Sequence, residues 1–160
     1  ARLVIENDDK ASMYSVRDLY EMVHIVTEIP ITFDYWHHTF NTGDLTEAEA
    51  FFMARETWDR HGVTQCTHYS ESRRRENQLL IERMFKHHNI DMANIEKWPT
   101  FHKEYKAFSK IKEQAHADYI TKLPNTYGVD SLDIVVEAKA KEMALQNINV
   151  QCVQNTPIIT

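Results

Sequence analysis

The stretch PITFDYWHH, residues 30–38, joins a short apolar run to an acid, two aromatic residues and two histidines. Its first five residues predict a buried strand that ends at Asp34. Carboxylate and imidazole groups cost free energy to desolvate unless another group pairs with them. Because Asp34, His37 and His38 come at or directly after the end of this strand, we look for their partner elsewhere in the chain.

Three other stretches also predict strands, and they lie at residues 3–6 (LVIE), 63–68 (VTQCTH) and 132–137 (LDIVVE). Apolar residues recur at helical spacing between them, which predicts helices over residues 15–26, 46–62 and 138–148. Ser15 is the expected N-cap of the first helix, and Thr46 with Glu49 forms a capping box for the second, with Gly62 as its stop. Strands joined by helices indicate an α/β fold with a parallel sheet and right-handed crossovers.

Residues 71–115 interrupt this alternation with a long, polar, helical stretch that Pro99 divides into two halves. We expect a helical pair inserted over one face of the sheet. The stretch is rich in basic residues: Arg73, Arg74, Arg75, Lys97, Lys103, Lys106, Lys110 and Lys112. They indicate either a basic arm for a phosphate backbone or a solvated helix face. Residues 149–160 have no clear pattern, so we expect one domain over residues 1–148 followed by a tail.

Composition limits the class of protein. The 160 residues are 42% hydrophobic and include only 3 Gly and 4 Pro, as expected for a single folded core. The net charge of −6 gives no support to nucleic-acid binding through bulk charge, so such contact requires a local basic patch or bound metal. No run approaches the ~20 apolar residues of a membrane helix. Two cysteines, Cys66 and Cys152, make no disulfide framework, which favours an intracellular location, in nucleus or cytoplasm depending on the source.

Ligand-type side chains stand at the ends of all the predicted strands. Glu6, Asp34, His68 and Glu137 close the four strands, His37 follows the second, and His116 lies in the connection before the fourth. The carboxyl ends of parallel strands lie on one side of a sheet. Carboxylates with imidazoles suit Mn, Zn or Fe, and two such metals about 3.5–4 Å apart form a clamp that cleaves phosphoesters. The alternative for each single residue is an ordinary hydrogen-bonded group at the sheet edge.

Five motifs resemble, in order, those of the carboxyl-terminal half of the UV damage endonucleases: RLVIENDDKASMYSV (2–16), IPITFDYWHH (29–38), THYSES (67–72), HADYI (116–120) and DIVVEAKAKE (133–142). The resemblance implies the carboxyl-terminal half of a (β/α)8 TIM-type barrel, a fold shared with xylose isomerase and the abasic-site endonucleases. It also implies a DNA repair nuclease, a hydrolase that cuts the phosphodiester 5′ to a damaged base with manganese.

The resemblance also implies roles for individual residues. The family's metal ligands match Glu6, Asp34, His37, His68, His116 and Glu137, and the complete enzyme is expected to hold two or three Mn²⁺ ions. Lys139 and Lys141 match the family pattern EAKxKE and are the predicted catalytic residues. Cys66 stands where the family usually has a lysine, and compact members lack the insertion at 71–115.

A complete barrel needs roughly 250 residues, and this chain supplies four βα units. We therefore expect a carboxyl-terminal part whose sheet edges are covered by a missing amino-terminal half-barrel or by a partner chain. The expected substrate is damaged double-stranded DNA. The alternatives are a non-catalytic half-barrel remnant, an interaction module, or a related abasic-site endonuclease.

Overall fold

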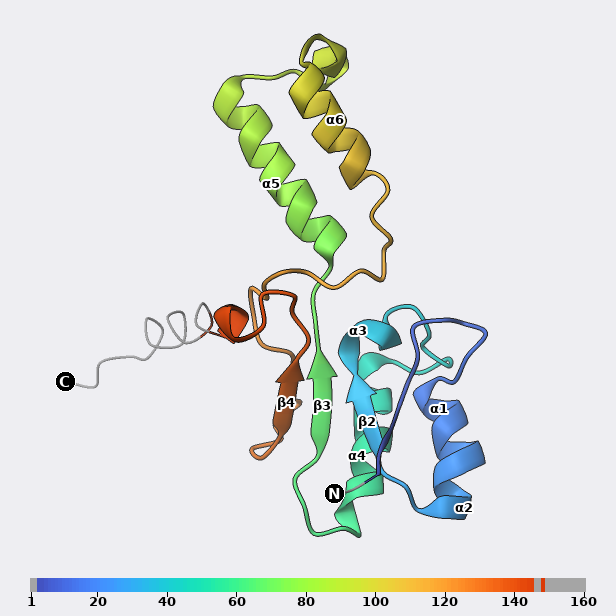
Figure 1. Cartoon of the computed structure of the whole chain (residues 1–160). Helices are drawn as coiled ribbons and strands as arrows, with labels where there is room; N and C mark the ends of the chain where they lie inside the picture. Colours follow the sequence, from blue (N-terminus) through green and yellow to red (C-terminus); the bar gives the residue numbers. More distant parts are fainter. Residues whose placement is uncertain (1–2, 146–147, 149–160) are drawn as a thin grey trace, which may run out of the picture.

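The computed structural model describes residues 3–145 and residue 148 (Figure 1). Within this part of the chain, four parallel strands form one sheet in the order β1-β2-β3-β4. Their bounds are Ile5–Glu6 (β1), Ile31–Asp34 (β2), Cys66–Tyr69 (β3) and Asp133–Val136 (β4). The register places Asp34 opposite His68 and His68 opposite Val135. The α/β fold with a parallel sheet is thus confirmed, although β3 begins at Cys66 and not at Val63.

The first crossover contains one unbroken helical stretch after a loop at residues 7–15. This stretch consists of α1 (Val16–Leu19), a π-helical segment η1 (Tyr20–His24) and α2 (Ile25–Thr27). Ser15 is the N-cap, as predicted: its hydroxyl accepts from Asp18 N–H, and the Asp18 carboxylate accepts from Ser15 N–H at 2.8 Å. The reciprocal pair satisfies two backbone donors that a helix start leaves free.

The second crossover contains α3 (Tyr35–His38) and α4 (Glu47–Asp59). Thr46 and Glu49 form the predicted capping box at the start of α4. The predicted stop is wrong by a few residues, because α4 ends at Asp59 and Gly62 lies in the following turn at φ +59°. That left-handed conformation is one that glycine adopts without steric cost.

The core lies between β2 and helices α1 and α4. Ile31 and Phe33 are completely buried there, together with Val16 and Phe51. Helix α4 also anchors the start of β2, since Trp58 Nε1 donates to Ile31 O at 2.7 Å. The strand that carries Asp34 is therefore attached to α4 at its first residue.

The helical pair comprises α5 (Arg73–His88), the 3-10 segment η2 (Met92–Lys97) and α6 (Pro99–Phe108). Figure 1 shows it extending away from the sheet, beyond the carboxyl ends of the strands. The expectation that it covers a face of the sheet is wrong. The reason is that its apolar side chains bury one another: Phe85, Ile90 and Ile95 form a separate small core, against which Ile81, Phe101 and Tyr105 pack.

The segment after β4 also differs from expectation. Residues 139–141 form a turn, and helical structure is described for residues 142–145 and 148, so the predicted start at 138 is wrong. Backbone N–H groups of Lys139 and Ala140 donate to Ala117 O and Asp118 O at 3.1 and 3.0 Å, which ties this turn to a distant loop. The predicted tail, residues 149–160, lies outside the described residues. No helix in the described part of the chain has the length and apolar character to cross a membrane.

Candidate metal centre

Carboxylates and imidazoles from all four strands meet at one edge of the sheet. Glu6 ends β1, Asp34 ends β2, His68 lies in β3, and Glu137 directly follows β4. Parallel pairing brings these positions to the same end, as the register of Asp34 with His68 shows. The structure therefore brings the predicted strand-end residues together.

The six predicted ligands form a connected set of close contacts. Glu6 lies at its centre: Oε1 is 3.3 Å from His37 Nδ1, and Oε2 is 3.1 Å from His68 Nδ1. Glu137 joins two imidazoles in the same way, at 3.1 Å from His68 Nδ1 and 3.4 Å from His116 Nδ1. Each glutamate thus turns its two oxygens toward two different imidazoles.

Asp34 and His37 are fixed by the start of α3. Asp34 is the N-cap of this helix, and its Oδ1 accepts from His37 N–H at 2.8 Å. Its other oxygen, Oδ2, is buried without a hydrogen-bond partner and lies 3.8 Å from His37 Nδ1. The cap therefore uses one carboxylate oxygen and leaves the second turned to the cluster.

Asn7, which was not predicted from the sequence, holds the backbone of Asp34 in place. It is 1% exposed, its Nδ2 donates to Asp34 O at 3.0 Å, and its Oδ1 accepts from Asp34 N–H at 2.9 Å. Its backbone oxygen lies 2.9 Å from His37 Nδ1. The signal available in the sequence was its place directly after Glu6 in the motif ENDD.

His116 reaches the cluster through the root of the helical pair. A backbone bridge joins it to Ser72 in antiparallel fashion, and Arg73 N–H donates to Ala115 O at 2.9 Å beside it. The centroids of the His116 and His37 rings are 5.9 Å apart. The segments that enter and leave the pair therefore place one of the six side chains.

Burial and mutual charge shift the pKa values strongly. Burial raises the pKa of Asp34 to about 6, against the lowering effect of the His37 N–H bond. Burial alone would raise the pKa of Glu6, but the imidazoles of His37 and His68 lower it to about 2. Burial would lower the pKa of His37, but contact with Glu6 and the charge of Asp34 raise it to about 9. The imidazolium therefore supplies the positive charge that the carboxylates need.

The donor set suits a divalent cation. Among the described residues, ligand atoms lie within 4.8 Å of one another in two groups that share Glu6: Glu6, Asp34 and His37, and Glu6, His68 and Glu137. His68 Nδ1 is buried 3.1 Å from two carboxylate oxygens, yet neither contact has good hydrogen-bond geometry. A cation in the first group would satisfy the unpaired Asp34 Oδ2, and a cation in the second group would satisfy this nitrogen. Carboxylates with imidazoles favour Mn, Fe or Zn.

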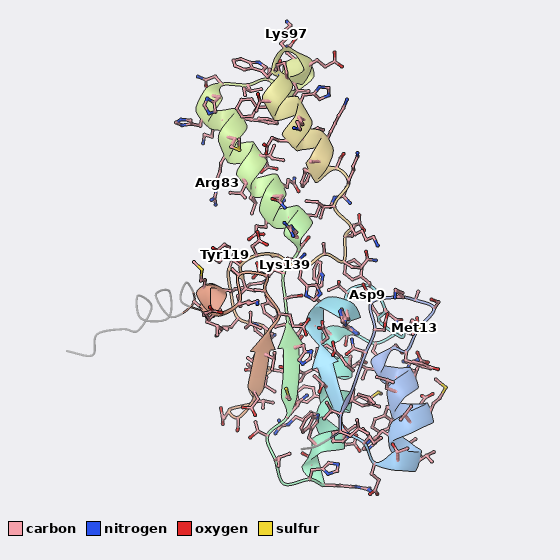
Figure 2. The ribbon with its side chains drawn as sticks, in the orientation of Figure 1. Asp9, Met13, Arg83, Lys97, Tyr119 and Lys139 are labelled. Atoms are coloured by element: carbon pink, nitrogen blue, oxygen red, sulfur yellow. The ribbon has the colours of Figure 1, made fainter. Side chains whose placement is uncertain are left out.

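The remaining candidates lie outside these contacts. Lys139 and Lys141 are exposed in the turn after β4, and Lys141 has a left-handed backbone at φ 54°. Figure 2 shows Lys139 near the carboxyl ends of the strands. Their predicted catalytic role stays a prediction. His38 instead joins the core, with its ring 5.5 Å from that of Phe33, and burial lowers its pKa.

Cys66 lies two residues before His68, and the alternation of a strand puts both on the same face. Partial burial raises the pKa of its thiol, and the charges of Asp133 and Glu6 add to the effect. The side chain below the cluster is therefore a neutral thiol.

The chain is similar to known proteins of one family. Residues 1–156 match the family model described as UV-endonuclease UvdE. A UV-damage endonuclease of Schizosaccharomyces pombe (strain 972 / ATCC 24843) is 34% identical over 150 residues, which cover 91% of this chain and 19% of the relative. A UV-damage endonuclease of Neurospora crassa is 34% identical over 79 residues, 44% of this chain and 12% of the relative.

A solved structure titled "Crystal Structure of SacUVDE" is also similar. The match has a TM-score of 0.57 and 26% identity, and it covers 97% of this chain and 41% of that chain. This chain thus spans less than half of the proteins to which it is similar. The family match extends over almost all of its length, and the chain belongs to the UV-endonuclease UvdE family.

Proposed function

We propose that this chain is the carboxyl-terminal part of a UV-damage DNA endonuclease, which cleaves the phosphodiester 5′ to a lesion in duplex DNA. The observation that carries the proposal is the convergence of three carboxylates and three imidazoles at one end of the sheet, in a member of this family. Burying several carboxylates and imidazoles together costs free energy of desolvation. A structural role alone gives no return for this cost, whereas a bound metal does.

We infer that the sheet is half of a (β/α)8 barrel and that the helical pair is an insertion into it. Parallel strands in sequential order support this, as does a match that covers 41% of the SacUVDE chain. An amino-terminal half-barrel, or a partner chain, would then pair with the edges at β1 and β4 and add further ligands.

We assign Mn²⁺ to the cluster, with two or three ions in the complete enzyme. Bound there, such ions would polarise the scissile phosphodiester and lower the pKa of a water molecule. Glu6 offers one oxygen to each of the two ligand groups, and Asn7 and the α3 cap orient Asp34. His37 and His68 would hold the metal through an unprotonated ring nitrogen, so a protonated imidazolium would have to lose one proton before binding. Lys139 and Lys141, exposed beside this edge, are suited to hold a DNA phosphate.

Titration of the 160-residue chain with Mn²⁺ tests the metal centre, with free Mn²⁺ detected by electron paramagnetic resonance. We expect binding by the wild type and at least about tenfold weaker binding by His68→Ala, because a ligand is lost. His87→Ala, at an exposed position of α5, is the matched control and should bind as the wild type does. A wild type that takes up no Mn²⁺ would show that the proposed centre is wrong.

Activity is tested in a polypeptide that supplies the rest of the barrel. It should nick UV-irradiated plasmid in the presence of Mn²⁺ and leave unirradiated plasmid intact, and His68→Ala should abolish the nicking. Equal nicking of plasmid with abasic sites and no UV lesions would instead favour the related abasic-site endonuclease.

A further inference from the structure

Charge is segregated between the helical pair and the rest of the molecule. Residues 73–112 contain ten Lys and Arg against five Asp and Glu, whereas the other 120 residues contain eight against nineteen. The pair therefore has a net charge of +5 in a chain of net charge −6. The positive charge resides on the part of the molecule that stands clear of the sheet (Figure 1).

Several acids of the pair are occupied by internal hydrogen bonds. Glu76 accepts from two backbone N–H groups of the loop after α6, at 2.9 and 3.1 Å. Glu82 accepts from Gln78 Nε2 at 2.8 Å, and Asp91 caps η2 through a bond of 2.9 Å. These carboxylates therefore have local structural roles, and they do not neutralise the lysines of α6.

Helix α6 has one apolar face and one basic face. Phe101 and Tyr105 pack against the small core shared with α5. Lys103 and Lys106 of α6 are exposed, as is Lys110 in the turn directly after the helix, and these three lysines line a shallow groove of about 580 Å³ together with Glu96. Like charges three residues apart in a helix, such as those of Lys103 and Lys106, repel each other, and in the described part of the chain no ion pair offsets the three lysines. An external polyanion would remove this repulsion.

The start of α5 lies next to the candidate metal centre. Ser72, directly before α5, is bridged to His116, one of the six clustered residues. Helix α5 has 16 residues, so the pair reaches about 24 Å from that start. Figure 2 shows Arg83 partway along α5, pointing away from α6, and Lys97 at the far tip. Positive side chains thus occur along the whole reach of the pair.

We propose that the pair α5–α6 is a DNA-binding arm whose basic face on α6 contacts backbone phosphates of the duplex beside the metal centre. The inference rests on the proposed function, which makes duplex DNA the substrate. The occupant is a regular array of phosphates because the lysines form a row and the groove between them is shallow. At about 3.4 Å per base pair, an arm of this length spans about seven base pairs.

The test measures binding of the 160-residue chain to an undamaged, fluorescein-labelled 24-base-pair duplex by fluorescence anisotropy, in EDTA and at several salt concentrations. Lys106→Glu/Lys110→Glu should lower the affinity about tenfold and reduce the slope of log K against log salt by about 1.8, which corresponds to two phosphate contacts. Lys106→Arg/Lys110→Arg keeps the charge and should bind as the wild type does. Arg55→Glu/Arg60→Glu changes the net charge equally outside the arm and should stay within twofold of the wild type.

Circular dichroism of each variant verifies folding. The proposal is overturned if the wild type does not bind the duplex at low salt, if the lysine variant binds within twofold of the wild type, or if the arginine control loses as much affinity. Equal competition by poly-L-glutamate at matched charge would assign the face to an acidic protein and also overturn it. Because the assay contains neither metal nor lesion, its outcome is independent of manganese binding and nicking, which test the proposed function.

Discussion

Asn7 gives the sharpest test of how the fold orients the cluster. The ladder between β1 and β2 ends at the pair Glu6 and Thr32, and the Asn7 side chain then takes over the role of a strand neighbour. Its amide bonds both the N–H and the C=O of Asp34, at 2.9 and 3.0 Å, in a fully buried environment. Asn7→Ala removes both bonds and leaves two buried backbone groups without a partner.

The expected magnitude follows from these two groups. A buried donor or acceptor left unpaired costs about 1–3 kcal/mol, so the free energy of unfolding should fall by about 2–6 kcal/mol. That is a large part of the ~5–15 kcal/mol of a typical domain. Asn41→Ala is the matched control, because Asn41 is also buried but bonds Lys10 O at 3.0 Å, outside the ligand residues.

Urea unfolding in EDTA measures the loss of stability, and Mn²⁺ titration below the unfolding transition measures the loss of metal affinity. Asn7→Ala should be the less stable variant and should bind Mn²⁺ at least about tenfold more weakly than Asn41→Ala. The reasoning is refuted if both variants have the same unfolding free energy and the same Mn²⁺ affinity.

Two further predictions concern the pH dependence of Mn²⁺ binding and the completeness of the catalytic site in this chain. Since the pKa of His37 is raised to about 9 in the metal-free protein, its imidazole is protonated on both ring nitrogens at pH 7, and a metal must displace one of these protons. Mn²⁺ affinity should therefore rise between pH 6.5 and 8.5, by up to about tenfold per pH unit. A flat affinity profile in titrations across that range would contradict the assignment. The 160-residue chain alone should not nick UV-irradiated plasmid with Mn²⁺. Catalytic ligands must be held within about 0.5 Å of the productive geometry, and four strands supply only part of the ligand set. Efficient UV-dependent nicking by the chain alone would show that its site is complete.

The sequence predicted the strands and their polar ends because both signals are local. An apolar run followed by an acid or histidine identifies Asp34 and His68 without knowledge of any partner. The direction of the helical pair was not predictable in this way. Helical spacing shows that Phe85 and Phe101 lie on apolar faces, but it does not show that these faces meet each other instead of the sheet.

Long-range backbone contacts explain the other differences. An asparagine after a strand is typical of a turn, so nothing local indicates that Asn7 bonds a residue 27 positions away. The helix after β4 begins late because Lys139 N–H bonds Ala117 O, a partner that helical periodicity does not reveal.

The two oxygens of Asp34 have different roles, one in folding and one in the cluster. Oδ1 caps α3, a task that an asparagine performs equally well, whereas Oδ2 faces the cluster as a buried charge with no hydrogen bond. In the metal-free protein, Asp34→Asn would keep the cap and remove a desolvated carboxylate. Selection for stability alone therefore favours the amide at this position, and a lineage keeps the acid only while the site is in use. Residue 34 is accordingly the place to look, across relatives, for members that have kept the fold and abandoned the reaction.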